Sequence, residues 1–236
     1  QFAVSENNWL GKGVKLETAL NLSSEQISGN ILMNNPNYNF SDKSLKAGVS
    51  ISSTDRSSSS GFKSSRTGFV LGTGFEQYED LFFTPEINVA FEEIEVDASA
   101  STAIKNMEGD FFNIDFTYGL TLDKRDQSWK PTEGYKTTFI QALPIIQDSS
   151  AIENGLHISA YHDFTDDIIG SLKFHARAIN GLDDDVRLTK RLYIPRNSLR
   201  GFNTRRVGPK DGEDWIGGNY TAGLSAEAQL PNLLPE

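Results

Sequence analysis

The sequence has no cysteine among its 236 residues, which excludes a disulfide framework, a thiolate nucleophile and a cysteine-ligated zinc site. It also has no apolar run near the ~20 residues that a transmembrane helix requires. Acidic residues outnumber basic ones, 32 to 22, and the net charge of −10 argues against nucleic acid as a partner. The absence of a long apolar run does not exclude a transmembrane β-barrel, because the strands of such a barrel are apolar only at every second residue.

Signatures of enzymes and cofactor sites are missing as well. The chain contains no nucleophile-elbow, zinc-protease, phosphate-loop or dinucleotide motif. The run Asp183–Asp185 lacks the glycine and the distal glutamate of a calcium loop. The histidines at 157, 162 and 175 show no metal-type spacing. We therefore expect a protein that is not an enzyme and that uses no metal, nucleotide or other cofactor.

Alternation of apolar and polar residues is the strongest pattern in the chain. It is clearest over residues 112–122 and recurs over 14–22, 45–52 and 172–178. Weaker stretches bring the total to about eleven strands, with no convincing helix. Many of the strands run about 9–11 residues, the length that a tilted strand needs to cross a bilayer. An apolar phase slip between Phe91 and Ile94 predicts a β-bulge or a strand bend. The fold class predicted is all-β, and the strand length favours a transmembrane antiparallel β-barrel, although a lipocalin-like barrel also has long strands.

The apolar set of each strand forms one stripe, which we expect to face lipid, with the polar set facing the lumen. The residues expected to point outward are Leu16, Leu20, Ile114, Phe116, Leu172, Phe174 and Leu224. Those expected to point inward are Lys15, Glu17, Asn113, Asp115, Lys173, Arg177 and Glu227. The connections between strands can be numbered in chain order. The longest ones, 52–65, 97–109 and 181–217, are then all even-numbered and fall on one side of the barrel, as in bacterial outer-membrane barrels.

Two turns stand out. The first is a glycine-containing turn with an aromatic residue at its edge, formed by Asn8, Trp9, Leu10 and Gly11. The second contains Asp123, Arg125 and Asp126 and then Pro131, Thr132 and Gly134. Proline and glycine supply the backbone angles of a tight turn, and the carboxylates can pair with Arg125 or accept from turn amides. No histidine lies near the two aspartates in sequence, so we do not interpret them as a catalytic pair.

A basic loop with the residues Leu199, Arg200, Gly201 and Phe202 lies between two amphipathic strands. We expect this loop to fold back onto a polar surface. The strand that follows, 220–230, carries one carboxylate on its polar face, Glu227, which is a candidate partner for Arg200. The planar guanidinium of arginine suits such a pair because it can bind a carboxylate through two hydrogen bonds.

The two turns and the loop, in this order, resemble the motifs of the outer-membrane protein assembly-factor superfamily, BamA and its relatives. The resemblance implies a sixteen-strand barrel of which residues 1–236 form strands two to twelve. The first strand, the last strands and the periplasmic transport domains would then be absent from this chain. It also implies that both turns are periplasmic and that Arg200 enters the lumen and meets acidic residues there.

The same resemblance implies a function: an insertase that assembles β-barrel proteins in the outer membrane of a Gram-negative-type bacterium. Its partners would be the lipid bilayer, unfolded β-barrel clients and accessory assembly lipoproteins. A sister-family two-partner secretion or translocation-assembly transporter is the first alternative, and the two turn motifs favour the insertase over it. A passive porin-like channel or a soluble ligand-binding barrel is the second. A porin should lack the inward loop, and a soluble barrel should turn its apolar faces inward.

Overall fold

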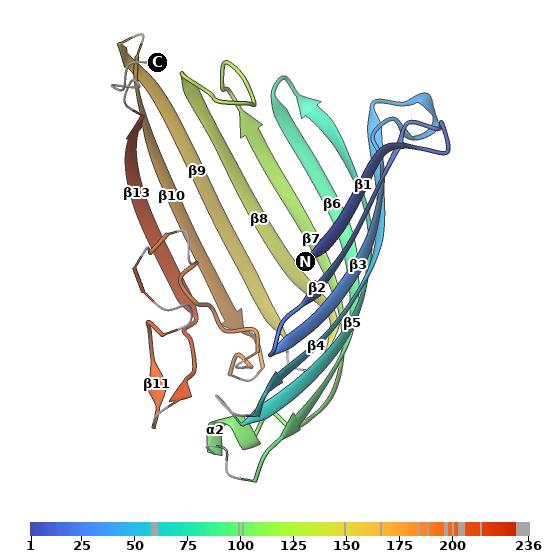
Figure 1. The fold of residues 1–236 in the computed structure, drawn as a ribbon, viewed down its shortest axis with the longest axis vertical. Coiled ribbons are helices and arrows are strands. Elements are labelled where there is room, and N and C mark those ends of the chain that lie inside the picture. Colours follow the sequence, from blue (N-terminus) through green and yellow to red (C-terminus); the bar gives the residue numbers. More distant parts are fainter. Residues whose placement is uncertain are drawn as a thin grey trace.

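The computed structural model of the chain describes residues 1–57, 61–98, 100, 102–148, 150–165, 167–183, 185–187, 189–195, 198–199, 201–202, 206–212 and 214–229. Eleven strands form one curved sheet, seen in Figure 1. They are β1 (Phe2–Trp9), β2 (Val14–Leu22), β3 (Gln26–Asn35), β4 (Lys43–Arg56), β5 (Phe62–Tyr78), β6 (Leu81–Val96), β7 (Gly109–Asp123), β8 (Gly134–Gln147), β9 (Ala151–Thr165), β10 (Ile168–Gly181) and β13 (Tyr220–Gln229).

The sheet is an antiparallel meander in which each strand pairs with its neighbours along the chain. Its order runs from β1 to β10 and ends with β13, so β1 and β13 form the two edges and the sheet is open. A separate two-stranded hairpin, β11 (Lys210–Asp211) and β12 (Asp214–Trp215), lies within the connection between β10 and β13. The predicted all-β antiparallel fold with eleven main strands is confirmed.

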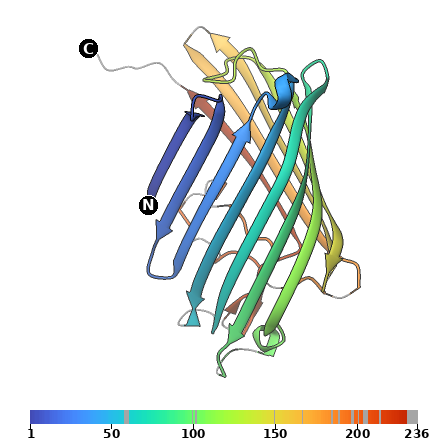
Figure 2. The ribbon, with the colours of Figure 1, turned by 90° about the vertical axis from the view of Figure 1, so that its right-hand side faces the viewer.

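One face of the sheet is apolar and the other is polar. The register places Ile87 of β6, Phe116 of β7 and Leu143 of β8 in one row, on the apolar face. Many large side chains of this face are exposed, such as Leu224 at 66%. The sheet curls around its polar face, toward which the long connection after β10 returns (Figures 1 and 2). The apolar stripe therefore lies on the outside, as the alternation predicts for a barrel in lipid.

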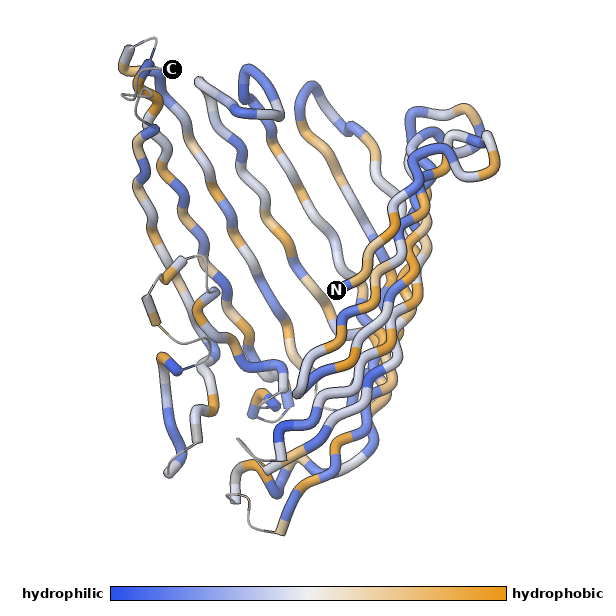
Figure 3. Tube along the Cα trace, viewed as in Figure 1, coloured by the Kyte–Doolittle hydropathy of each residue, from blue (hydrophilic) through white to orange (hydrophobic). Residues whose placement is uncertain are grey.

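The alternation along each strand can be followed in Figure 3, where apolar and polar residues succeed one another. Among the described residues, only two small apolar clusters are buried, and both involve segments that fold over the polar face. No helix in the described part of the chain is long and apolar enough to cross a membrane.

Strand length departs from the prediction. Strands β4 to β10 have 14 to 17 residues, longer than the 9–11 expected. The serine-rich stretch 52–65 is mostly sheet, with Ser53 opposite Ser65 and Asp55 opposite Lys63. Backbone ladders need no apolar side chain, so a polar strand beyond the membrane gives no alternation signal. The even-numbered connections 23–25, 57–61 and 148–150 are therefore all short, and only 97–108 and 182–219 of the five are long.

The β-bulge predicted between Phe91 and Ile94 is wrong, because the β6–β7 register runs through both residues without a shift. Ile94 lies on the inner face and is buried by Ile104 and Met107, beside the one-turn helix α2 (Thr102–Lys105). Register shifts occur elsewhere in the sheet, and one of them lies between β7 and β8, where the pairing shifts at Pro144. Proline lacks a ladder N–H and is commonly found at such bulges.

Candidate functional site: the long loop on the polar face

The connection 182–219, between β10 and β13, is held to the inner face of the sheet by an apolar contact at its start. Val186 and Leu192 from this loop pack with Ala151 of β9 and Ile179 of β10, and all four are buried. Burying an aliphatic side chain of this size stabilises a structure by ~1.5–3 kcal/mol. The predicted return of the loop to a polar surface is therefore seen in its first half.

Arg187 carries the loop across to β7. Its Nη2 donates a 2.9 Å hydrogen bond to Oδ1 of Asn113, and its Cζ lies 4.0 Å from the ring centroid of Phe111. Only 9% of Arg187 and 4% of Asn113 are exposed. Burial lowers the pKa of Arg187, while the carboxylate of Glu92, on the adjacent strand β6, opposes this shift. Arg187 thus links the loop to β7.

Lys190 makes a second polar link between the loop and the inner wall. Its Nζ donates to Oε1 of Gln147 at 2.9 Å, and Gln147 in turn donates from Nε2 to Asp115 of β7. Burial lowers the pKa of Lys190, and the nearby charge of Arg187 lowers it further. A buried cation is costly unless it is paired or hydrogen-bonded, so these contacts fix the position of the loop.

Further contacts make the loop compact. Arg191 pairs with Asp185 at 2.7 Å within the loop itself. Leu192 and Gly218 exchange two backbone hydrogen bonds of 2.7 and 2.9 Å, which tie the start of the loop to its end. The Asp183–Asp185 run, considered above for calcium, thus supplies an arginine partner. Within the described residues, no group of three or more metal-ligating side chains is present.

Three residues of the motif at 199–202 are described, Leu199, Gly201 and Phe202. Gly201 has φ of +84° and Phe202 is 61% exposed, and the preceding Ser198 contacts the inner face at His175. Arg200 lies outside the described residues, and with it the predicted Arg200–Glu227 pair. Glu227 accepts a 2.9 Å hydrogen bond from Lys173 of β10, on the polar face where the alternation places both.

The turn between β7 and β8 is organised by its two aspartates, as its sequence predicts. Asp123 accepts from Nε and Nη2 of Arg125 at 2.7 and 2.8 Å, a bidentate pair. Asp126 accepts from the Thr132 amide and hydroxyl and from the Glu133 amide, at 2.9 to 3.2 Å. Desolvation raises the pKa of Asp126, but these hydrogen bonds outweigh it and hold the pKa below 3.8. The two carboxylates are therefore structural in this turn.

The turn between β1 and β2 is closed by Asn8. Its Oδ1 accepts from the Gly13 amide at 2.6 Å, and its carbonyl accepts from the Gly11 amide at 3.0 Å. Leu10 and Gly11 adopt φ of +55° and +72°, and Trp9 is 44% exposed beside them. Both turns lie at the same end of the strands, opposite to the end from which the long loop leaves (Figure 1).

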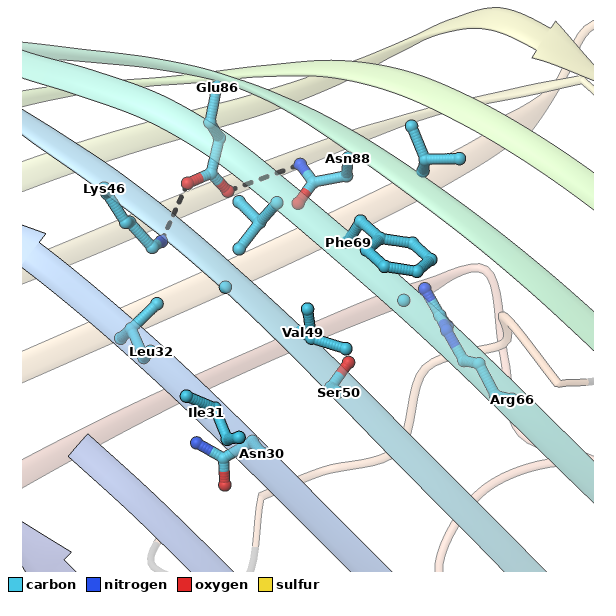
Figure 4. Close-up of a pocket in the computed structure, with 14 residues that line it drawn as sticks. Asn30, Ile31, Leu32, Lys46, Val49, Ser50, Arg66, Phe69, Glu86 and Asn88 are labelled. Atoms are coloured by element: carbon cyan, nitrogen blue, oxygen red, sulfur yellow. Dashed lines mark hydrogen bonds and ion pairs between the residues drawn. The ribbon is translucent and has the colours of Figure 1, made fainter. Parts of the chain in front are cut away.

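The inner face also has a pocket of about 290 Å³ over β3 to β6, shown in Figure 4. Gly48 and Gly68 are among its lining residues, and a β-carbon at Gly48 would approach Leu32 Cδ1 to 2.8 Å. Lys46 and Glu86 form an ion pair of 2.8 Å at one side of the pocket. The mixed lining offers both apolar and polar contacts to a group that enters the lumen.

The sequence did not identify Arg187, Lys190 or Gln147 as site residues. Val186 and Leu192 are apolar, but so are other residues of the loop, such as Leu182 and Ile194, so the sequence does not single them out. No local pattern connects Arg187 with Phe111 and Asn113, which lie more than seventy residues earlier. Only the register of the sheet brings these groups together.

Comparison with known proteins agrees with this geometry. The family model described as "Omp85 superfamily domain" matches residues 8–235. The curated outer membrane protein assembly factor BamA of Neorickettsia risticii is 26% identical over 245 residues, covering 99% of this chain and 32% of the relative. The protein of the same name from Nitratidesulfovibrio vulgaris is 29% identical over 243 residues, covering 96% and 30%. The chain thus spans about a third of the length of these relatives.

A solved structure shares the fold. The crystal structure of BamA from Haemophilus ducreyi lacking POTRA domains 1–3 superposes with a TM-score of 0.84 at 18% sequence identity. The alignment covers 99% of this chain and 50% of that one. Together with the family match, the apolar outer face and the inward loop show that the chain belongs to the Omp85 superfamily, as a β-barrel segment of an integral outer-membrane protein of Gram-negative bacteria.

Proposed function

We propose that the protein containing this chain is an outer-membrane insertase, which assembles β-barrel proteins and inserts them into the bilayer. The observation that carries the proposal is the loop 182–219, anchored through Arg187 on the inner wall of an Omp85 barrel segment. The curated relatives that match the chain bear the name of an assembly factor, which supports the same function. The activity requires no metal or nucleotide and is not an enzymatic reaction.

In this proposal the barrel wall and the loop have separate roles. The outer apolar face embeds the wall in the lipid of the outer membrane. The inner loop occupies the lumen, where the motif residues Leu199 to Phe202, with Arg200 and Glu227 as partners, stabilise its inserted position. The hydrogen-bonded geometry of the two turns fixes strand register at the periplasmic end of the barrel. The proposed partners are unfolded β-barrel clients and accessory assembly lipoproteins.

The chain also fits strands two to twelve of a sixteen-strand barrel. On this proposal the first strand, the last four strands and the periplasmic domains belong to other parts of the full-length protein. A sister transporter of the same superfamily would share the wall and the loop, so a functional assay must separate the two.

The test is reconstitution of the full-length protein in lipid vesicles, followed by addition of an unfolded β-barrel client. An insertase should speed the appearance of the folded, protease-resistant client relative to vesicles without it. Arg200→Ala should slow this step, and Arg200→Glu combined with Glu227→Arg should recover more than either single change. Passage of a secreted polypeptide with no client folding would instead indicate the transporter.

A further inference from the structure

The polar face of β9, β10 and β13 holds a histidine in a narrow slot. His175 of β10 lies directly opposite His157 of β9 on one side and Gly223 of β13 on the other. The two imidazole rings stack at 22° with centroids 6.5 Å apart. The ring of His175 is therefore bounded by a neighbouring ring and by a residue without a side chain.

Gly223 is needed for the ring to occupy this place. A β-carbon at position 223 would overlap the His175 ring, lying 2.9 Å from Nε2 and 3.1 Å from Nδ1. Contacts this short with β-carbon atoms are essentially absent from real proteins, so the ring would have to move. The φ of Gly223 is not positive, so the requirement is for space and not for backbone freedom.

The loop reaches this ring. Oγ of Ser198 lies 3.3 Å from Nδ1 of His175, and the hydroxyl donates when Nδ1 carries no proton. Nε2 of His175 is buried and has no hydrogen-bond partner within the described part of the chain. There, the contact with Ser198 is the one hydrogen bond that the ring makes. Ser198 immediately precedes the motif at 199–202. The contact therefore lies far along the loop from the anchor at Arg187.

We propose that His175, seated over Gly223, is a positioning residue that holds the loop against the inner wall at Ser198. The importance of the loop for insertion rests on the proposed function. The contact between His175 and Ser198 does not depend on that function. Ser198 then adds an attachment farther along the loop to those that Val186, Arg187, Lys190 and Leu192 make near its start. The attachment at Ser198 requires a small residue at position 223 and a hydrogen-bonding ring at position 175.

The chain offers a matched control for the glycine. Gly155 lies on the same inner face of β9, and a β-carbon there would make ordinary contacts of 3.8 Å with Arg177 Cγ and 3.9 Å with His157 Nε2. Gly223→Ala and Gly155→Ala thus add the same methyl group to neighbouring strands. Only the first should displace the His175 ring.

The experiment is limited trypsin digestion of the loop at Arg206, in the folded full-length protein in vesicles. Cleavage of a segment that opens rapidly tracks the population of its open form. Gly223→Ala, His175→Phe and Ser198→Ala should each speed cleavage roughly two- to tenfold, the range for the loss of one hydrogen bond. Gly155→Ala and Ser198→Thr should match the wild type.

Two further variants separate positioning from general loss of structure. His175→Asn, which places an oxygen near the site of Nδ1, should restore slow cleavage relative to His175→Phe. In a His175→Ala background, Gly223→Ala should have no further effect, because the ring that it displaces is gone. Additive effects of these two changes, or wild-type cleavage in Gly223→Ala, would overturn the proposal.

Client insertion by the same variants tests the proposed function separately. Fast loop cleavage with unchanged insertion would contradict a role of the loop in insertion, but not the positioning role of His175. Slow cleavage in Gly223→Ala and His175→Phe would refute the positioning role of His175, whatever the insertion rate.

Discussion

The guanidinium of Arg187 lies 4.0 Å from the ring centroid of Phe111 and donates to Asn113, so a loop that leaves the sheet at β10 is anchored on β7. The attachment crosses two intervening strands on the inner face. A cation over an aromatic ring in a desolvated place contributes ~2 kcal/mol, and its hydrogen bond adds to this. The anchor thus uses contacts that water does not screen.

Removing this anchor should loosen the loop. Arg187→Ala leaves the Asn113 carbonyl oxygen buried without its donor, a cost of ~1–3 kcal/mol. Arg187→Lys should restore part of it, because lysine keeps the charge but not the planar fork. Hydrogen exchange of loop amides, measured by mass spectrometry, should show the change. Arg191→Ala is the control, since Arg191 pairs within the loop at Asp185; equal effects of the two variants would contradict the anchor.

The two turns predict different responses to the same substitution. Gly11 and Gly134 have φ of +72° and +90°, so alanine is strained at both, by ~1–2 kcal/mol. At Gly134 the added β-carbon also overlaps the Lys124 carbonyl and lies 2.9 Å from Arg125 Cα, whereas at Gly11 it meets nothing within 4 Å. Urea unfolding should therefore show Gly134→Ala destabilised by ~3 kcal/mol or more. Similar losses at both positions would argue against this turn geometry.

Adjacent residues of β7 test which face meets lipid. Phe116 lies on the apolar face and Thr117 on the polar face, where its hydroxyl accepts from Asn88 at 3.1 Å. Phe116→Arg should cost ~2–4 kcal/mol in the bilayer. Thr117→Arg places its charge in the lumen and should cost clearly less. Unfolding of both variants in vesicles decides the point, and the reverse order would place the lumen on the wrong side.

The β7–β8 turn should respond to pH through Asp126. Because its pKa is held below 3.8, the carboxylate stabilises the turn fully above that value. The contribution is lost only as the pH falls through the lowered pKa. Protection of the Thr132 and Glu133 amides should show this step by nuclear magnetic resonance, and Asp126→Asn should abolish it. A loss of protection above pH 4 in the wild type would contradict the hydrogen bonding described here.

Much of the fold could be predicted from the sequence because lipid on one side and a polar lumen on the other impose a period of two. Residues 112–122 show this plainly, since Phe116 and Asp115 must face different solvents. The pattern fails where the solvent is the same on both faces. Ser53 and Ser65 pair in the sheet beyond the membrane, and nothing in their polarity marks them as strand.

The site was less predictable than the fold. Asp126 and Gly134 could be interpreted because the turn is local and its partners lie within eight residues. Ile94 was misassigned to a bulge because the residues that cover it, Ile104 and Met107, arrive from a loop. Arg187 was missed for the same reason: its partners depend on a register that no short sequence window contains. The alternation along a strand carries no information on which distant loop residues will pack against it.

The central claim is that the loop after β10 packs on the inner face of the barrel wall. Residues 1–236 contain no cysteine, so cysteines can be placed at Val186 in the loop and Ala151 on β9, in a full-length protein from which any cysteine elsewhere has been removed. A short bis-maleimide should join this pair in native outer membranes, and should not join Val186→Cys to Leu172→Cys on the outer face of β10. Efficient cross-linking to 172, or none to 151, would contradict the account.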